Sequence, residues 1–104
     1  MTNNFQQILQ MGQQVQARLS QLQTELGEKT VSSSSGGGMV SVSVDGRGRV
    51  RGVDIDPSVL EGGDVEMLED LVLAAISSAQ SRAATVYEEE MRKLSGGLPL
   101  PFQL

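Results

Sequence analysis

The chain has 104 residues and a net charge of −5, from eight Lys and Arg against thirteen Asp and Glu, and it contains neither cysteine nor histidine. The missing residue types exclude the usual zinc sites, disulfide frameworks and nucleophiles activated by an imidazole. We therefore expect a protein that is not an enzyme, holds no metal or cofactor and takes no small-molecule substrate. The length fits a single domain over residues 1–104, and the negative charge means that any polyanion must be bound by a local basic patch.

No part of the sequence approaches the run of about 18 apolar residues that a membrane span requires. The start, Met1-Thr2-Asn3-Asn4, also lacks the basic segment and apolar run of an export signal. The sequence thus predicts a cytoplasmic protein without a membrane partner.

Residues 1–27 are predicted to form one long helix that projects as an arm. Apolar residues recur at alternating spacings of three and four, and glutamines fill most positions between them, so one narrow apolar stripe runs along a polar cylinder. At 1.5 Å per residue the stretch from Asn3 to Leu26 is about 36 Å long, the width of a small domain. Gly27 is expected to end it as a left-handed C-cap. The stripe consists of Phe5, Ile8, Gly12, Val15, Leu19, Leu22 and Leu26, of which only Gly12 lacks an apolar side chain.

Residues 28–57 are predicted to form a small antiparallel sheet of two or three strands. Valine alternates with polar residues over 40–45, which is the period of a half-buried strand. Asp45-Gly46 then favours a type I′ hairpin, and the next strand is expected over 49–55. The serines and glycines of 32–38 leave two interpretations open, a flexible turn or a further strand hidden by its composition.

Residues 64–95 are predicted to form a second long helix that Asp64 caps, which makes the fold class α+β. Over two early turns this helix has almost no polar face, which indicates burial on more than one side. One thin sheet cannot cover that segment, so we expect a second copy of the chain to pack against it. Residues 96–104 contain Pro99 and Pro101 and are expected to form an extended tail. The residues expected at the dimer interface are Leu68, Leu71, Val72, Ala75, Ile76 and Ala79.

The element order and several motifs resemble the YbaB/EbfC family of nucleoid-associated proteins, over nearly the whole chain. The resemblance implies a tweezer-like homodimer in which the sheets and second helices join the subunits and the long helices are arms that engage double-stranded DNA. It also implies a place at the bacterial nucleoid, with largely sequence-nonspecific binding that affects chromosome organisation and gene expression. The motifs are Gly36-Gly37-Gly38-Met39-Val40, Asp45-Gly46, Val53-Asp54-Ile55-Asp56-Pro57-Ser58-Val59-Leu60, Met67-Leu68-Glu69-Asp70-Leu71-Val72 and Gly96-Gly97-Leu98-Pro99.

The basic residues are the candidates for contacts with DNA phosphates. The densest group is Arg47, Arg49 and Arg51, for which a solubilising strand edge is an equally good interpretation. Many relatives have lysine-rich first helices, whereas Arg18 is the only basic residue on this one, so DNA binding is expected to be weak and salt-sensitive. The candidates expected to line a cleft between the helices are Arg18, Lys29, Arg82, Arg92 and Lys93, the last two being also favoured at a helix C-terminus by its dipole.

A second function remains open beside DNA binding. The apolar stripe of the first helix is suited to dock a partner helix, and the acidic surface would then serve solubility. The chain would in that case be an acidic dimeric protein-interaction module with little or no DNA binding.

Overall fold

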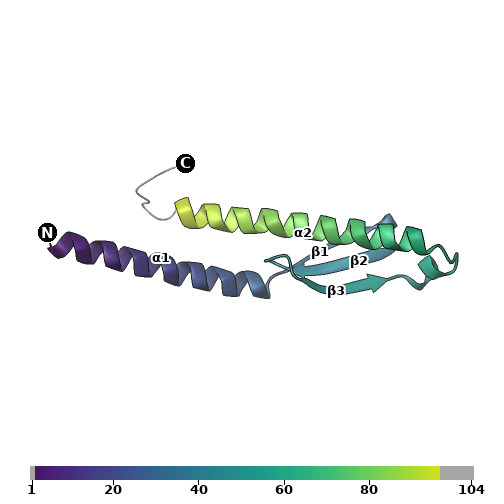
Figure 1. The fold of residues 1–104 in the computed structure, drawn as a ribbon, viewed down its shortest axis with the longest axis horizontal. Coiled ribbons are helices and arrows are strands. Elements are labelled where there is room, and N and C mark those ends of the chain that lie inside the picture. Colours follow the sequence, from purple (N-terminus) through teal and green to yellow (C-terminus); the bar gives the residue numbers. More distant parts are fainter. Residues whose placement is uncertain (1, 97–104) are drawn as a thin grey trace.

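The computed structural model describes residues 2–96, and Figure 1 shows an elongated molecule with a small sheet at one end and a helical arm at the other. The molecule measures 74 × 24 × 16 Å and has a radius of gyration of 20.2 Å. A compact chain of this length has a radius of gyration of about 13 Å. The expected α+β class is confirmed. The elements are α1 (Thr2–Glu28), β1 (Thr30–Ser35), β2 (Val40–Asp45), β3 (Val50–Ile55) and α2 (Val65–Gly96), with short 3-10 helices at Gly36–Gly38 and Pro57–Leu60.

The predicted arm helix exists, but its expected end was wrong. α1 continues through Gly27, which does not adopt a positive φ, and ends at Glu28. The N–H of Lys29 then donates to the carbonyl oxygens of Glu25 and Leu26, at 3.1 and 3.3 Å. The last turn is therefore closed by ordinary backbone hydrogen bonds, without a left-handed cap.

The apolar stripe of α1 falls into two halves with different surroundings. Leu22 and Leu26 are buried near the sheet, whereas Phe5 and Ile8 remain 64% and 66% exposed. In Figure 1 the N-terminal part of α1 extends past the end of α2. We call residues 5–12 the free half of the stripe.

The serine run is a strand, which settles the two interpretations of that segment. β1 pairs antiparallel with β2, from Thr30 opposite Asp45 to Ser35 opposite Val40, in a sheet of order β1-β2-β3. The Ser35 hydroxyl donates to the backbone oxygen of Leu71 at 2.6 Å. A second 2.6 Å hydrogen bond joins the hydroxyls of Ser33 and Ser78. Since α2 satisfies the inward-facing hydroxyls, a polar strand can lie beneath a helix.

The core forms where α2 lies across β1 and β2. The three valines of β2 are buried, as the alternating pattern predicted, and they pack against Ala75, Ala79 and Ala83. These alanines recur every fourth residue on one face of α2, and their small side chains let the helix approach the sheet closely. Ala75 and Ala79 are fully buried within a single chain. Their assignment to the dimer interface was therefore wrong, because the sheet already covers them.

β3 lacks the helical cover that β1 and β2 have. In the register, Val53 lies opposite Val42 and Ile55 opposite Val40, so the apolar side chains of β3 share the inner face of the sheet. Yet Val50, Val53 and Ile55 are 44%, 42% and 39% exposed. We call these three residues the β3 strip. The sequence analysis missed it, because strand periodicity identifies a face without saying whether anything covers that face.

The β2–β3 hairpin differs from the type I′ turn that Asp45-Gly46 predicted. The Gly48 N–H donates to the Asp45 carbonyl oxygen and the Asp45 N–H donates to the Arg49 carbonyl oxygen, both at 2.9 Å. The residue with positive φ is Gly48, at 89°, and not Gly46. β3 accordingly begins at Val50, one residue later than expected.

The second helix starts as the sequence predicted. The Met67 N–H donates to Asp64 Oδ1 at 3.0 Å, so Asp64 is the expected N-cap. α2 continues to Gly96, and the tail expected after it, residues 97–104, lies outside the described residues. Over residues 2–96, neither long helix is apolar enough to cross a membrane.

Candidate nucleic-acid interface

The β2–β3 hairpin holds three arginines around one buried carboxylate. Asp45 is 1% exposed, and its Oδ1 accepts from the backbone N–H groups of Arg47 and Arg49 at 2.8 and 3.0 Å. Its Oδ2 makes no hydrogen bond among the described residues and lies 3.8 Å from Nε of Arg51. Burial disfavours the charged carboxylate, but the two N–H groups and the charges of Arg47 and Arg51 outweigh it and lower the pKa of Asp45 below its ordinary value. The ionised Asp45 therefore fixes the hairpin backbone.

Two of these arginines lie against the C-terminus of α1. The Arg51 guanidinium donates through Nη2 to the Gly27 carbonyl oxygen at 3.2 Å. A Cβ placed on Gly27 would lie 3.1 Å from Nη2 of Arg47, so Gly27 makes room for that guanidinium. Cations are favoured at a helix C-terminus because its unpaired carbonyl groups carry partial negative charge. The hairpin thus joins the arm to the sheet, while Arg49 is left exposed to solvent.

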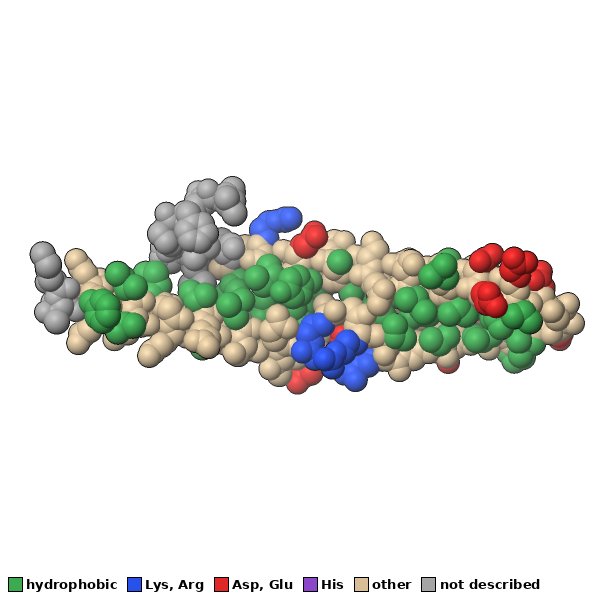
Figure 2. All heavy atoms as spheres, viewed as in Figure 1, with side chains coloured by type: hydrophobic (Ala, Val, Ile, Leu, Met, Phe, Trp, Pro, Cys, Tyr) green, Lys and Arg blue, Asp and Glu red, His purple; other side chains and the backbone are tan. Residues whose placement is uncertain are grey.

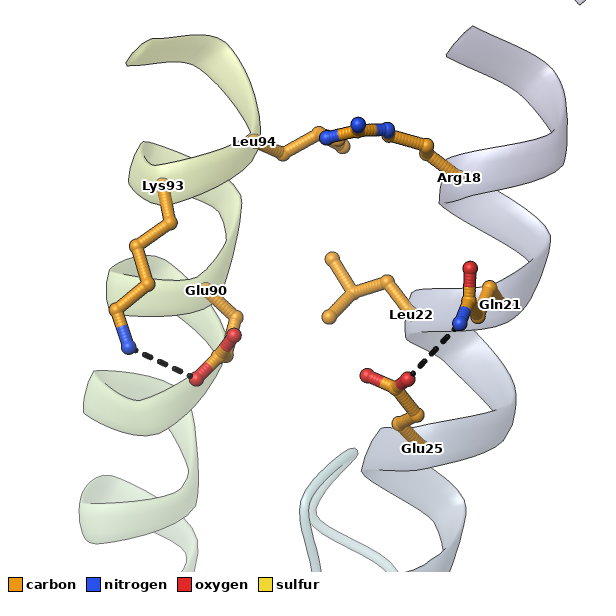
Figure 3. Close-up of a pocket in the computed structure, with 7 residues that line it drawn as sticks. All are labelled: Arg18, Gln21, Leu22, Glu25, Glu90, Lys93 and Leu94. Atoms are coloured by element: carbon orange, nitrogen blue, oxygen red, sulfur yellow. Dashed lines mark hydrogen bonds and ion pairs between the residues drawn. The ribbon is translucent and has the colours of Figure 1, made fainter. Parts of the chain in front are cut away.

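A cleft of about 310 Å³ lies between the C-terminal halves of α1 and α2. Figure 3 shows Arg18 extending across it from α1 toward Leu94 of α2, with Leu22 pointing inward below. On the α2 side, Lys93 Nζ lies 3.4 Å from Glu90 Oε1. The cleft is too small to admit a duplex, so Arg18 and Lys93 are available to DNA only along its rim.

Glu90 couples two of the candidate lysines. Its Oε1 also lies 3.4 Å from Nζ of Lys29, at the junction between α1 and β1. The hydrogen bond and charge of Lys93, and then Lys29, outweigh the cost of partial burial and lower the pKa of Glu90 below its ordinary value. The two lysines therefore share one ionised carboxylate.

The expected cleft does not bring all five of its candidates together. Only Arg18 and Lys93 line it. Lys29 and Arg82 line a separate hollow beside β1, where the Arg82 guanidinium donates to the Ser32 carbonyl oxygen. Arg92 lines a third hollow on the outer side of α2. The candidates form a belt around the middle of the molecule, and a single continuous cleft was the wrong geometry.

Charge is segregated along the molecule. From Asp54 to Asp70 the sequence has seven carboxylates and no cation, and this segment forms the sheet end furthest from the N-terminus (Figure 1). The rest of the chain carries all eight cations and only six carboxylates. On the face in Figure 2, basic side chains gather at the middle and acidic side chains at the sheet end. Although the whole chain has a net charge of −5, the part outside residues 54–70, which contains the belt, therefore has a small net positive charge.

These features define a class, an elongated α+β protein with a projecting arm and a separate basic belt, and that class suits contact with an extended polyanion. Within this class, the sequence assigns the chain to one particular family. The sequence matches the YbaB/EbfC DNA-binding family over residues 1–98, and the chain belongs to that family. The resemblance expected from the motifs is confirmed, and membership in a DNA-binding family accords with the expectation that the chain is not an enzyme.

Relatives from several bacteria extend the match. A nucleoid-associated protein of Gemmatimonas aurantiaca is 41% identical over 90 residues, which is 86% of each chain. One from Rhodospirillum rubrum is 41% identical over 98 residues, or 94% of this chain and 92% of the relative. The crystal structure of an uncharacterized protein, HP0035 from Helicobacter pylori, is 30% identical, with a TM-score of 0.72 over 89% of this chain and 94% of that one.

Proposed function

We propose that this chain binds double-stranded DNA at the bacterial nucleoid through phosphate contacts, largely without regard to sequence. The observation that carries the proposal is the segregation of charge, which places all eight cations away from the seven-carboxylate sheet end. A local positive surface attracts a polyanion even when the whole chain is acidic, because screening limits each charge to its surroundings. Membership in a DNA-binding family, and relatives described as nucleoid-associated, support the same function.

The contacts of the cations make the binding weak and salt-sensitive. Lys29 and Lys93 share Glu90, and Arg51 is engaged with Asp45 and Gly27. Each neutralised phosphate releases condensed counterions and adds about 0.9 to the slope of log affinity against log salt. Since phosphates carry no base identity, binding of this kind has little sequence preference.

We further propose that two chains form a homodimer through the sheet end. The β3 strip leaves three apolar side chains 39–44% exposed on the inner face of the sheet, and Leu73 on α2 is 64% exposed. An exposed apolar patch of this kind marks an interface, and a two-fold axis lets the same patch cover itself. Such a dimer keeps the basic belts and arms of both chains at its periphery. Leu68, Leu71, Val72 and Ile76 are half-buried around the core and remain interface candidates.

Fluorescence anisotropy with a labelled duplex tests the DNA-binding proposal. We expect binding at low salt that weakens steadily toward physiological salt, with similar affinities for unrelated duplex sequences. Absence of binding at the lowest salt would contradict it.

One observation favours the protein-interaction module as the second candidate. The free half of the stripe exposes Phe5 and Ile8, which an amphipathic partner helix would bury. Pull-down from lysate before and after nuclease treatment separates the two functions. A protein partner that survives nuclease supports the module, whereas loss of every partner supports DNA binding.

A further inference from the structure

The part of α1 that extends past the end of α2 has an exposed apolar side and no charged side chain. Figure 1 shows this extension, and Arg18, which reaches toward Leu94 near the end of α2 (Figure 3), lies where it begins. No Asp, Glu, Lys or Arg occurs from Thr2 to Ala17. Since cations neutralise phosphates, residues 2–17 cannot add to the salt-dependent binding of DNA. Their apolar side is suited to a different partner.

The exposed apolar side chains of this extension lie on one side of the helix. With Phe5 at position a of a heptad, the stripe residues alternate between positions a and d. Leu9 and Met11, which are also exposed, fall at positions e and g and flank the stripe. The remaining positions b, c and f hold only glutamine from residue 6 to residue 14. A helix with this pattern is suited to bury its apolar side against another helix.

We propose that this part of the arm pairs antiparallel with the same part of a second copy of the chain. The stripe positions 5, 8, 12 and 15 have spacings of three, four and three, which read the same from either end. When two arms run in opposite directions about a two-fold axis at residue 10, each a position therefore faces a d position. Phe5 of one arm then faces Val15 of the other, and Ile8 of one arm faces Gly12 of the other.

Gly12 gives the pair room for close packing. Ile8 is 66% exposed, and a Cβ placed on Gly12 would meet nothing within 4 Å. The missing side chain on one arm therefore leaves space for the isoleucine of the other, and large side chains opposite small ones let packed layers interdigitate. Glycine is unfavourable inside a helix, so the pairing gives this residue a role that compensates for its low helix propensity.

The absence of charge favours a second arm over an unrelated helix as the partner. In paired helices, charged residues at positions e and g set partner choice and orientation. Positions e and g carry no charge from Thr2 to Ala17, so nothing there selects a different chain and two copies meet without repulsion. Their association buries apolar side chains without removing an ion from water.

The contact between two arms is short and therefore weak. Residues 5–15 span about 15 Å of helix at 1.5 Å per residue, which buries far less than the roughly 1,600 Å² of a standard interface. The pairing becomes effective where many copies are held close together, because neighbouring weak sites act at a high effective concentration. It requires neither DNA nor the sheet-end dimer. Its consequence, that arms join particles bound along DNA, rests on the proposed function.

Single cysteines test the pairing in the full chain, which has no cysteine of its own. About a two-fold axis at residue 10, position 11 of one arm lies beside position 11 of the other. Met11→Cys is therefore expected to give a covalent two-chain product with a short bismaleimide, in the absence of DNA. Gln10→Cys is the matched control, because it lies on the polar side of the same turn. We expect severalfold less product from Gln10→Cys, and equal yields would overturn the proposal.

A third cysteine position tests the direction of the pairing. In the antiparallel pair the two Phe5 positions are about 15 Å apart along the axis, beyond the reach of a short spacer. In a parallel pair in register they would lie side by side. Phe5→Cys is therefore expected to give as little product as Gln10→Cys. Both side chains are exposed, so the fold tolerates these changes, and a yield from Phe5→Cys equal to that from Met11→Cys would overturn the antiparallel arrangement.

Charge variants of Met11→Cys show which surface carries the contact. Adding Ile8→Asp places a charge in the stripe and is expected to reduce the yield severalfold, whereas Gln7→Asp adds the same charge on the polar side and should preserve it. Adding Val53→Asp, which disrupts the proposed sheet-end dimer, should also preserve the yield. The proposal is overturned if Ile8→Asp leaves the yield unchanged or if Val53→Asp abolishes it. A failure of DNA binding would leave these results unaffected.

Discussion

The hairpin shows at the scale of single residues how an acidic side chain builds a basic surface. Asp45 is buried and accepts from two backbone N–H groups, which sets the path of the chain through Arg47 and Arg49. Gly46 beside it donates to the Leu26 carbonyl oxygen at 2.7 Å. Asp45-Gly46 was recognised in the sequence as a turn signal. Its role as the joint to α1 depends on long-range contacts that a local motif does not contain.

Gly46→Ala is expected to destabilise the protein by about 1–3 kcal/mol, the usual cost of overpacking. The new Cβ would lie 2.6 Å from the Leu26 carbonyl oxygen, where backbone meets backbone. Gly62→Ala is the matched control, because a Cβ there meets nothing within 4 Å. Urea unfolding at one fixed protein concentration measures the stability of both variants. Equal stabilities for Gly46→Ala and Gly62→Ala would contradict the close contact between Gly46 and the Leu26 carbonyl group.

Asp45→Asn is expected to lower stability at neutral pH, since it removes the charge that the N–H groups and arginines stabilise. The folded pKa of Asp45 is lowered from an ordinary value of 3.8. Its contribution is therefore present above that value and is lost as pH falls through the lower, folded pKa. Thermal unfolding followed from pH 7 downward should show the stability difference between variant and wild type shrinking in acid. A stability difference between variant and wild type that does not change with pH would mean that the charge of Asp45 does not contribute to stability.

At the scale of elements, the sequence predicted those helices and strands whose own residues show a local pattern, such as a periodic run of apolar side chains or a helix cap. α1, β2, the Asp64 cap and α2 all follow from such local signals. β1 was left open because its inward positions include serines, whose partners on α2 lie far away in sequence. The exposed β3 strip and the separation of the basic residues into three sites were missed for a related reason. Both depend on which surfaces α2 covers.

Because one half of the α1 stripe is buried and the other is exposed, shortening a side chain should lower the free energy of unfolding by different amounts in the two halves. Leu26→Ala empties a buried site and should cost about 2–5 kcal/mol. Ile8→Ala, at a position 66% exposed, should cost within about 0.5 kcal/mol. Denaturant unfolding at a fixed concentration compares them. Equal losses would mean that the arm is packed along its whole length.

At the scale of the whole molecule, the shape and the charge pattern have one common consequence. In the homodimer that we propose, chains 74 Å long pair through the exposed β3 strip on the sheet, away from the free half of the arm. The proposed pairing would double the number of basic belts in one particle. Linked sites of low affinity bind a long duplex more tightly than either does alone.

Val53→Asp is expected to halve the particle mass, because it places a charge in the proposed interface between the two β3 strips. Light scattering at micromolar concentration measures the mass, and circular dichroism checks that the helices persist. Ile8→Asp makes a comparable apolar-to-acid change on the arm and should leave the mass at that of two chains. A wild-type protein with the mass of one chain would refute the dimer.

The salt dependence of DNA binding by two matched charge variants tests the account most directly. Arg49→Gln and Gly62→Asp each shift the net charge by one unit, but the first acts in the basic belt and the second at the acidic end. We predict that Arg49→Gln reduces the slope of log affinity against log salt by about 0.9 per chain, while Gly62→Asp leaves it at the wild-type value. Equal slopes for wild type and Arg49→Gln, or an equal change in both variants, would show that the basic belt is not where this protein meets DNA.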